Sequence, residues 1–211
     1  MISCHTIKDK KSRICIIEYP LSLDKLKEAM GDDIEFYRTD LERIKQEGRQ
    51  KDFLALRLAL KKVLGGDVKQ ILYTDDGKPL LSDESYKISF SHCPNCVAVI
   101  VNPDQEVGID VEAPSPKLAA IHTRFLGKKE LAFYQESNSF DFLRIAWSAK
   151  EALYKIIGEQ AYNFAEQLQI LPFEMTREGE LETLHTDSDK TYKVHYALYE
   201  NYTLAYCTDE E

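Results

Sequence analysis

Apolar residues recur along the chain in short runs bounded by turn residues, a pattern that is typical of strands. "RICIIEYP" (13–20) is such a run and ends at a proline. "QILYTDDGKPLL" (70–81) enters an Asp-Gly turn, and Asn-Pro-Asp at 102–104 forms a turn within another run. The predicted strands lie at 13–20, 70–81, 86–92, 96–112, 168–175, 190–200 and 202–208.

Other segments carry apolar residues at helical spacing. The longest runs from 40 to 64 and is ended by the glycines at 65–66. A shorter helix is predicted at 22–30, with Ser22 as its N-cap. A third helical region covers 117–158, with breaks near 127 and 137–139.

Strand, helix and strand cluster therefore occur twice in succession along the chain. Each half has about 100 residues, a plausible size for a small domain. We expect an α+β fold with an N-terminal half at 1–103 and a C-terminal half at 104–211.

Composition and charge narrow the class of protein. The chain has 211 residues, of which 44% are hydrophobic and 30% charged, as in ordinary folded proteins. Its net charge of −9 argues against general binding of nucleic acid through phosphates. No apolar run approaches the roughly 18 residues of a membrane span, and the N-terminus does not read as a signal peptide, so we expect a cytoplasmic protein.

The five cysteines do not suggest a disulfide framework, because their number is odd and no secretory signal is seen. Cys93 and Cys96 in "HCPNCV" have C-x-x-C spacing between two predicted strands. A zinc site would need two further ligands, and a thioredoxin-like motif would open a helix. The sequence therefore favours a turn with two semi-buried thiols over a metal or redox site.

Two carboxylates share one face of a predicted strand in "EVGIDVEAP". Asp110 and Glu112 are separated by one residue, so their side chains point the same way. Like charges at this distance repel unless a cation lies between them. A Mg²⁺ ion would suit such oxygen ligands. An exposed acidic edge strand is the alternative, and the strand pattern does not decide between the two.

A possible third carboxylate lies in "FLRIAWSAKEALYKIIGE" (142–159). At helical spacing, Trp147, Lys150, Glu151 and Tyr154 fall along one side, and Lys155 follows Glu151 by one turn. Taken alone, this segment is explained by a half-buried helix with a Glu-Lys pair. Opposite Asp110 and Glu112, it would instead complete an acidic site.

Two further segments could bind an anion. Ser91 and His92 end an apolar strand in "SFSHCPN" and could donate hydrogen bonds to phosphate, although a histidine there is more often structural. "DGKP", with Lys78, is by itself only a turn with a solvated charge.

Five motifs occur in one order along the chain: "GKP" (77–79), "FSHC" (90–93), "VGIDVE" (107–112), "RFLGKKE" (124–130) and "WSAKEALYK" (147–155). Together they resemble the motif set of the 4′-phosphopantetheinyl transferases, specifically the monomeric surfactin-synthetase-type branch. The upstream "RQKDFLALRLALKKVLG" (49–65) resembles the N-terminal helix of that family. The resemblance covers 49–155, half of the chain.

The resemblance implies a reaction and a metal site. Members of the family transfer the phosphopantetheine arm of coenzyme A to a serine of an acyl or peptidyl carrier protein and release adenosine 3′,5′-bisphosphate. By this resemblance, Asp110, Glu112 and Glu151 hold Mg²⁺ against the pyrophosphate of coenzyme A. Glu151 is then the expected base for the serine, and Lys155 is expected to contact the reacting phosphate.

The resemblance also implies how coenzyme A is bound. Ser91 and His92 match a Ser-His pair that binds its phosphate, with His92 counted among the catalytic residues, and Lys78 with Pro79 matches the segment that lines the nucleotide. Arg49 is the candidate for the 3′-phosphate, with Arg57 as the alternative. Cys93 stands where relatives often have a serine. Lys150 and Glu130 also match motif positions, and each has a structural role as the alternative. Trp147 is expected in the core.

The family fold consists of two similar α+β halves related by a pseudo-twofold axis, with the site between them, so a chain with both halves is expected to be a monomer. The carrier protein is expected to contact the segment 159–173, which includes Glu159, Tyr162, Phe164 and Glu166. A Mg²⁺-dependent hydrolase of phosphoanhydrides and a non-catalytic carrier-binding module are the alternatives. The sequence does not identify the natural carrier, the acceptance of acylated coenzyme A or the preferred divalent ion.

Overall fold

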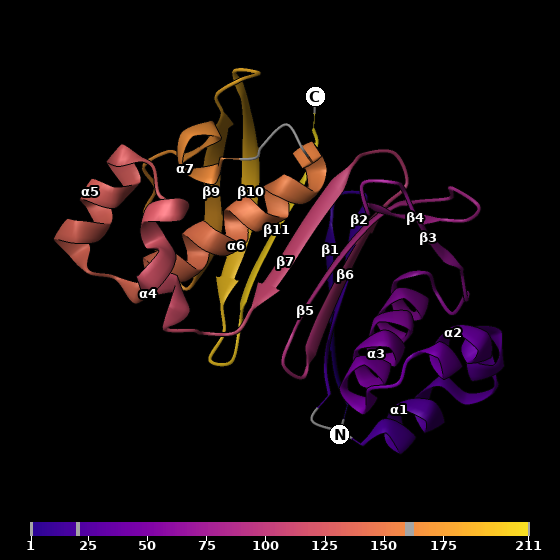
Figure 1. Cartoon of the computed structure of the whole chain (residues 1–211). Helices are drawn as coiled ribbons and strands as arrows, with labels where there is room; N and C mark the ends of the chain where they lie inside the picture. The colour runs from indigo at the N-terminus through magenta and orange to yellow at the C-terminus, as the bar shows by residue number, and fades with distance from the viewer. Residues whose placement is uncertain (1, 20–21, 159–162, 211) are drawn as a thin grey trace. The chain divides into compact units, whose positions relative to one another are not determined.

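The computed structural model describes residues 2–19, 22–158 and 163–210. They fall into two compact units, which we call unit 1 (Met1–Asp104) and unit 2 (Gln105–Glu211). Each unit combines an antiparallel sheet with helices, which confirms the predicted α+β class (Figure 1). No helix formed by the described residues has the length and apolar character needed to cross a membrane.

Unit 1 is built on a four-stranded sheet with the order β1-β2-β6-β5. Its central strand β6 is buried along its whole length and is flanked on both sides. Helix α3 packs on β6 and β2, and α1 packs on α3. The main elements are β1 (Ser3–Asp9), β2 (Ser12–Glu18), α1 (Leu23–Met30), α3 (Glu47–Val63), β5 (Lys87–Cys93) and β6 (Cys96–Asn102).

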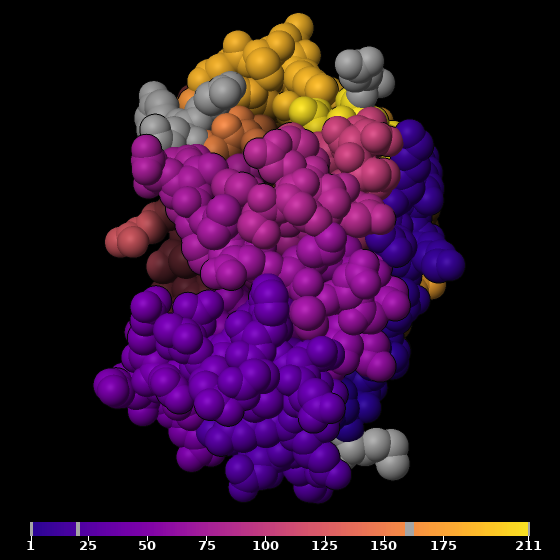
Figure 2. All heavy atoms as spheres, turned by 90° about the vertical axis from the view of Figure 1, so that its right-hand side faces the viewer, coloured from indigo at the N-terminus to yellow at the C-terminus, as the bar shows by residue number. Residues whose placement is uncertain are grey.

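Four shorter elements complete unit 1. They are η1 (Gly31–Tyr37), α2 (Arg38–Arg43), β3 (Ile71–Tyr73) and β4 (Pro79–Leu81). Strands β3 and β4 form the hairpin predicted around the Asp-Gly turn, and Gly77 in that turn has φ of 84°, which favours glycine. Figure 2 shows the helices of unit 1 as the indigo-to-purple surface and the segment with β3 and β4 in magenta.

One predicted helix was wrong in its extent, and the predicted N-cap residue of another was confirmed in position. The single helix expected at 40–64 is interrupted, because Ile44 is extended with φ of −85° and ψ of 112° between α2 and α3. The amide of Gln50 donates to the Ile44 carbonyl over 2.8 Å, which satisfies a carbonyl that leaves the helix. Ser22 does precede α1, but its side chain makes no capping hydrogen bond.

Unit 2 has a five-stranded antiparallel sheet with the order β7-β11-β10-β9-β8. The long helix α6 packs across β7, β11 and β10 (Figure 1). The strands are β7 (Val107–Glu112), β8 (Leu168–Ile170), β9 (Glu178–His185), β10 (Lys190–Leu198) and β11 (Thr203–Thr208). The helices are α4 (Lys117–Ile121), η2 (His122–Arg124), α5 (Lys128–Ser137), α6 (Phe140–Ile157) and α7 (Phe164–Gln167).

Strands β1 and β9 were not predicted, because most of their side chains are polar. In β9, "EGELETLH", only Leu181, Thr183 and His185 are buried, at alternate positions. Strand β8 is shorter than the predicted 168–175 and ends two residues before Pro172.

The two units repeat one local order of elements. In unit 1, β2 is followed by α3 and by the hairpin β5-β6, whose last strand pairs antiparallel with β2. In unit 2, β7 is followed by α6 and later by the hairpin β10-β11, whose last strand pairs antiparallel with β7. This repetition agrees with two similar halves. The pseudo-twofold axis stays a prediction.

Gly108 allows α6 to lie directly on β7. A Cβ atom at this position would be 1.9 Å from the carbonyl oxygen of Ala152 and 3.3 Å from Cγ1 of Ile156. The first distance is far shorter than a van der Waals contact and involves a backbone oxygen. No side-chain rotation would therefore relieve the clash. Glycine is therefore required here for close packing of helix on strand.

We expect Gly108→Ala to destabilise unit 2 by about 3 kcal/mol, because α6 would have to move away from the sheet. Chemical denaturation followed by circular dichroism would measure this. Gly48→Ala is the matched control: it lies in α3, a Cβ there meets no atom within 4 Å, and it should be neutral or stabilising by about 0.5–1 kcal/mol. Equal stabilities for the two variants would contradict the packing argument.

Candidate active site

The face of β7 that carries Gly108 also carries Asp110 and Glu112, and α6 covers it. Asp110 is only 4% exposed, and Glu112 is partly buried. The alternative of an exposed acidic edge strand is therefore wrong for Asp110. A buried carboxylate requires a compensating partner.

Lys155 is that partner. Its Nζ atom lies 3.2 Å from Oδ1 of Asp110 and donates to the carbonyl of Ile109 over 2.6 Å. The cation expected beside the carboxylates is thus an ammonium group in this structure. Lys155, expected to pair with Glu151 within the helix, forms an ion pair with Asp110 on the strand, and its charge also acts on Glu151.

Trp147 has a polar role that its sequence position did not reveal. It is half-buried rather than fully in the core, and its indole N–H donates to Oε1 of Glu112 over 3.3 Å. The ring also packs against Phe125 and Phe164, at centroid distances of 5.2 and 6.1 Å. Trp147 therefore orients Glu112 from the same helix that carries Glu151.

Glu151 lies in the electrostatic field of both carboxylates of β7. Burial raises the pKa of Glu151 to about 7, with the charges of Asp110 and Glu112 adding to the effect and that of Lys155 opposing it. Three acidic groups thus share one site with one ammonium group. Such a site has an excess of negative potential and favours a further cation.

The donor types suit a hard divalent cation, since all three side chains offer carboxylate oxygens. Within the described ranges, however, no three His, Cys, Asp or Glu side chains converge closely enough to hold a metal ion. Asp110 is bound to Lys155 and Glu112 to Trp147. Metal binding would require these side chains to rearrange, so the metal site stays a prediction.

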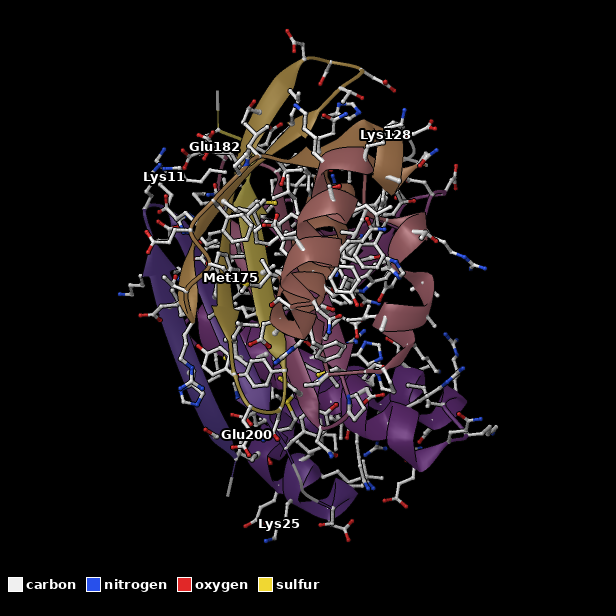
Figure 3. The ribbon with its side chains drawn as sticks, turned by 90° about the vertical axis from the view of Figure 1, so that its left-hand side faces the viewer. Lys11, Lys25, Lys128, Met175, Glu182 and Glu200 are labelled. Carbon is white, nitrogen blue, oxygen red and sulfur yellow. The ribbon has the colours of Figure 1, made fainter. Side chains whose placement is uncertain are left out.

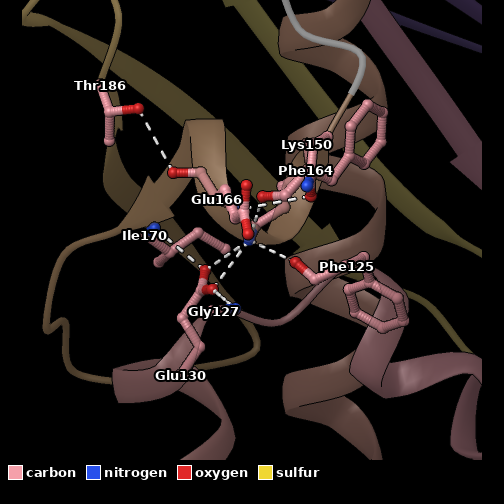
Figure 4. A network of polar contacts seen from close by, with 9 residues as sticks. Phe125, Gly127, Glu130, Lys150, Phe164, Glu166, Ile170 and Thr186 are labelled. Atoms are coloured by element: carbon pink, nitrogen blue, oxygen red, sulfur yellow. Dashed lines mark hydrogen bonds and ion pairs between the residues drawn. The ribbon is translucent and has the colours of Figure 1, made fainter.

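Lys150 faces away from this site and is fully buried. Its Nζ donates to the carbonyls of Phe125 and Phe164, over 2.6 and 3.2 Å, and lies 2.8 Å from the Glu130 carboxylate (Figure 4). Glu130 in turn accepts from the backbone N–H groups of Gly127 and Ile170. The structural alternative for Lys150 and Glu130 is therefore favoured: they fasten α5, α6, α7 and β8 together.

Unit 1 holds the residues predicted to bind coenzyme A. Ser91 and His92 are neighbours on β5, so their side chains point to opposite faces of the sheet. Nε2 of His92 is 3.9 Å from Oδ2 of Asp52 in α3. Asp52 is itself fixed by the hydroxyl of Tyr19, which donates to Oδ1 over 2.6 Å. Neither contact was foreseen from the sequence.

The predicted basic residues of unit 1 differ in accessibility. Arg49 is exposed in the first turn of α3, one turn before Asp52. Lys78 and Pro79 lie at the end of the hairpin turn, where the Lys78 carbonyl accepts from the N–H of Thr74. Arg57 is buried, with its guanidinium carbon 3.6 Å from the centroid of Phe53, which favours a structural role for it.

Cys93 and Cys96 close the β5-β6 hairpin opposite each other, and both are buried. A hydrogen bond with Cys93 and burial raise the pKa of the Cys96 thiol well above its ordinary value. A protonated thiol is a poor metal ligand and nucleophile. The predicted turn is present, and its two thiols are buried rather than semi-buried.

Phe164 of the expected carrier contact is half-buried against Tyr154, at a centroid distance of 5.5 Å, and Glu166 is exposed. Glu159 and Tyr162 lie outside the described residues.

The raised pKa of Glu151 predicts a pH dependence of stability in the protein freed of metal by a chelator. The folded state binds this proton more tightly than the unfolded state, so the stabilisation is complete below the unfolded pKa and is lost as pH rises through about 7. We expect wild type to lose about 2–3 kcal/mol between about pH 5 and about pH 8 relative to Glu151→Gln. Urea unfolding at both pH values measures the difference. Glu136→Gln on α5 is the control. An equal loss of stability in wild type and in Glu151→Gln would be inconsistent with the raised pKa of Glu151.

Breaking the Lys150–Glu130 pair should be costly. Lys150→Met leaves a buried carboxylate without its cation, and we expect a loss of about 3–5 kcal/mol. The double variant Glu130→Gln, Lys150→Met should lose less than the sum of the single variants, as measured in a double-mutant cycle by thermal and urea unfolding. Strict additivity would show that the pair is not coupled.

Residues 106–207 match the model of the 4′-phosphopantetheinyl transferase superfamily. The matched segment contains β7, α6 and β11, and thus all four charged residues of the site in unit 2. The chain is also similar to a Haemophilus influenzae protein that is provisionally named a 4′-phosphopantetheinyl transferase. The two are 29% identical over 153 residues, which covers 67% of this chain and 65% of that relative.

The match thus spans less than two thirds of the length of that relative. The family model and the relative agree with each other and with the motifs, and so confirm the resemblance. Over residues 106–207, the chain is thus similar to the 4′-phosphopantetheinyl transferase superfamily.

Proposed function

We propose that the protein is a Mg²⁺-dependent 4′-phosphopantetheinyl transferase that moves the phosphopantetheine arm of coenzyme A to a serine of an apo acyl or peptidyl carrier protein. Adenosine 3′,5′-bisphosphate is the second product. The observation that carries the proposal is the gathering of Asp110 and Glu112 from β7 with Glu151 and Lys155 from α6, inside the segment that matches the superfamily.

Asp110, Glu112 and Glu151 would hold Mg²⁺. When bound, the ion would neutralise negative charge on the diphosphate and on the leaving group. This is supported by the packing of α6, which carries Glu151, on β7, which carries Asp110, with the Gly108 contact fixing the helix on the strand. Lys155 already lies beside Asp110, so its ammonium group is suited to stabilise negative charge that builds on the transferred phosphate.

Glu151 would accept the proton of the carrier serine as the serine attacks the phosphate. The carboxylate is partly buried, and the two acidic neighbours make it a better proton acceptor than an exposed glutamate. Trp147 would keep Glu112 oriented through its indole N–H.

Coenzyme A would be bound by residues of unit 1: Arg49, Lys78, Pro79, Ser91 and His92. His92 and Arg49 gain support from Asp52, which lies next to His92 and one turn from Arg49. Arginine suits the 3′-phosphate because its guanidinium can donate two parallel hydrogen bonds. We further propose that halves 1–103 and 104–211 share a pseudo-twofold relation and act together in a cytoplasmic monomer.

The test is incubation of the purified protein with coenzyme A, Mg²⁺ and an apo carrier protein, followed by mass spectrometry of the carrier. We expect the carrier to gain one phosphopantetheine. Glu151→Gln should reduce the rate by about 10²–10⁴-fold because the proton acceptor is lost. Lys193→Ala, an exposed lysine of β10, is the matched control and should leave the rate unchanged.

Two outcomes would contradict the proposal. Release of adenosine 3′,5′-bisphosphate at the same rate without a carrier would indicate a hydrolase. Carrier binding without turnover, unaffected by Glu151→Gln, would indicate a non-catalytic module.

A further inference from the structure

Unit 2 contains a cavity of about 600 Å³, which we call the α5–β8 pocket. It is formed by α5, the first turn of α6 and the segment from α7 to Phe173. Its volume lies within the usual range of small-molecule sites. Asp110, Glu112, Glu151 and Lys155 are not among its lining residues, so the pocket is separate from the candidate metal site. Part of its wall, from Ala165 to Phe173, belongs to the segment expected to contact the carrier protein, so a ligand bound here would compete with that contact.

The inner surface of the pocket is aromatic. Phe133, Phe142 and Phe173 form a chain of rings with centroid distances of 4.8 Å and 6.4 Å. Phe142 is buried, whereas Phe133 is 45% exposed. An aromatic side chain that is half exposed in a concave site, beside other apolar walls, is typical of a surface that an apolar ligand covers.

The opening of the pocket is basic. Lys128 and Lys129 lie in the first turn of α5, and both are exposed; Lys128 is seen at the outer surface in Figure 3. Neither lysine forms an ion pair with any residue in the described parts of the chain. The N-terminal end of a ten-residue helix adds partial positive charge at the same place.

The acidic residues of the pocket do not cancel this charge. Glu130 is buried and neutralised by Lys150. Glu166 is exposed and contributes one negative charge against two positive ones. The balance at the opening therefore favours an anion.

The walls of the pocket are held in place before any ligand binds. The Glu130 carboxylate accepts from the N–H of Gly127 on one wall and from the N–H of Ile170 on another, and Lys150 fastens it to α6 (Figure 4). A preformed site loses little conformational entropy when a ligand binds.

We propose that the α5–β8 pocket binds an amphipathic carboxylate, whose aliphatic or aromatic body packs on Phe133, Phe142 and Phe173 while its carboxylate is held by Lys128 and Lys129. The apolar walls select the body of the ligand and the lysines select the sign of its charge. This inference concerns binding only and does not depend on the transferase activity.

The test uses decanoate as the probe, with binding followed by calorimetry and by amide chemical shifts of the full chain, without coenzyme A, metal or carrier. We expect saturable binding with shift changes around α5 and β8. Decyltrimethylammonium, which has the same chain and the opposite charge, should bind at least tenfold more weakly.

Two variants separate the parts of the site. Lys128→Glu with Lys129→Glu should weaken decanoate at least tenfold, and since acidic residues stabilise a helix N-terminus, the fold should persist. Ala165→Phe should abolish binding by filling the cavity that Ala165 lines. Lys117→Glu on α4, outside the pocket, is the control and should bind decanoate as wild type does.

Three results would overturn the proposal. The first is the absence of saturable decanoate binding, and the second is equal binding of the cationic probe. The third is a change in the amide chemical shifts of the pocket residues that a carrier protein causes and decanoate does not. This result would indicate a protein docking surface instead.

Discussion

The close approach of α6 to β7 at Gly108 is the contact on which the site in unit 2 depends. Because Gly108 has no Cβ atom, Ala152 and Ile156 lie directly over it. The helix runs antiparallel to the strand, with Lys155 near Ile109 and Trp147 near Glu112. Trp147 then reaches Glu112, and Lys155 reaches Asp110. A wider spacing would leave the carboxylates of the strand without these partners and buried at a high cost.

This packing concentrates negative charge around Glu151. Lys155 compensates Asp110 and the indole compensates Glu112, but Glu151 is left with a pKa near 7. The buried pair Lys150–Glu130, one residue along the same helix, does the opposite: its groups are fully satisfied and serve to fasten secondary-structure elements. Of two adjacent residues of α6, Glu151 thus lies in the candidate site, whereas Lys150 holds the surrounding helices and strands together.

Much of this could be predicted from sequence, and the limits have physical causes. Alternation and helical spacing located α6, β7 and the hairpins β3-β4, β5-β6 and β10-β11, because these elements bury one face or both. Strand β9 was missed because its outer residues are charged, and the break at Ile44 was missed because the hydrophobic pattern continues through it. The motifs identified Asp110, Glu112, Glu151 and Lys155, but the Asp52–His92 contact, the Trp147–Glu112 bond and the role of Gly108 depend on tertiary packing that spacing alone does not encode.

We propose that Asp110, Glu112 and Glu151 together bind a divalent cation and that Lys155 then turns from Asp110 to a phosphate. A crystal structure of the protein with Mn²⁺ and coenzyme A, read from the anomalous scattering of manganese, tests it most directly. We expect a manganese peak within coordination distance of all three carboxylates, with the Lys155 ammonium turned towards a phosphate. A peak elsewhere, with Lys155 still bound to Asp110, would contradict it.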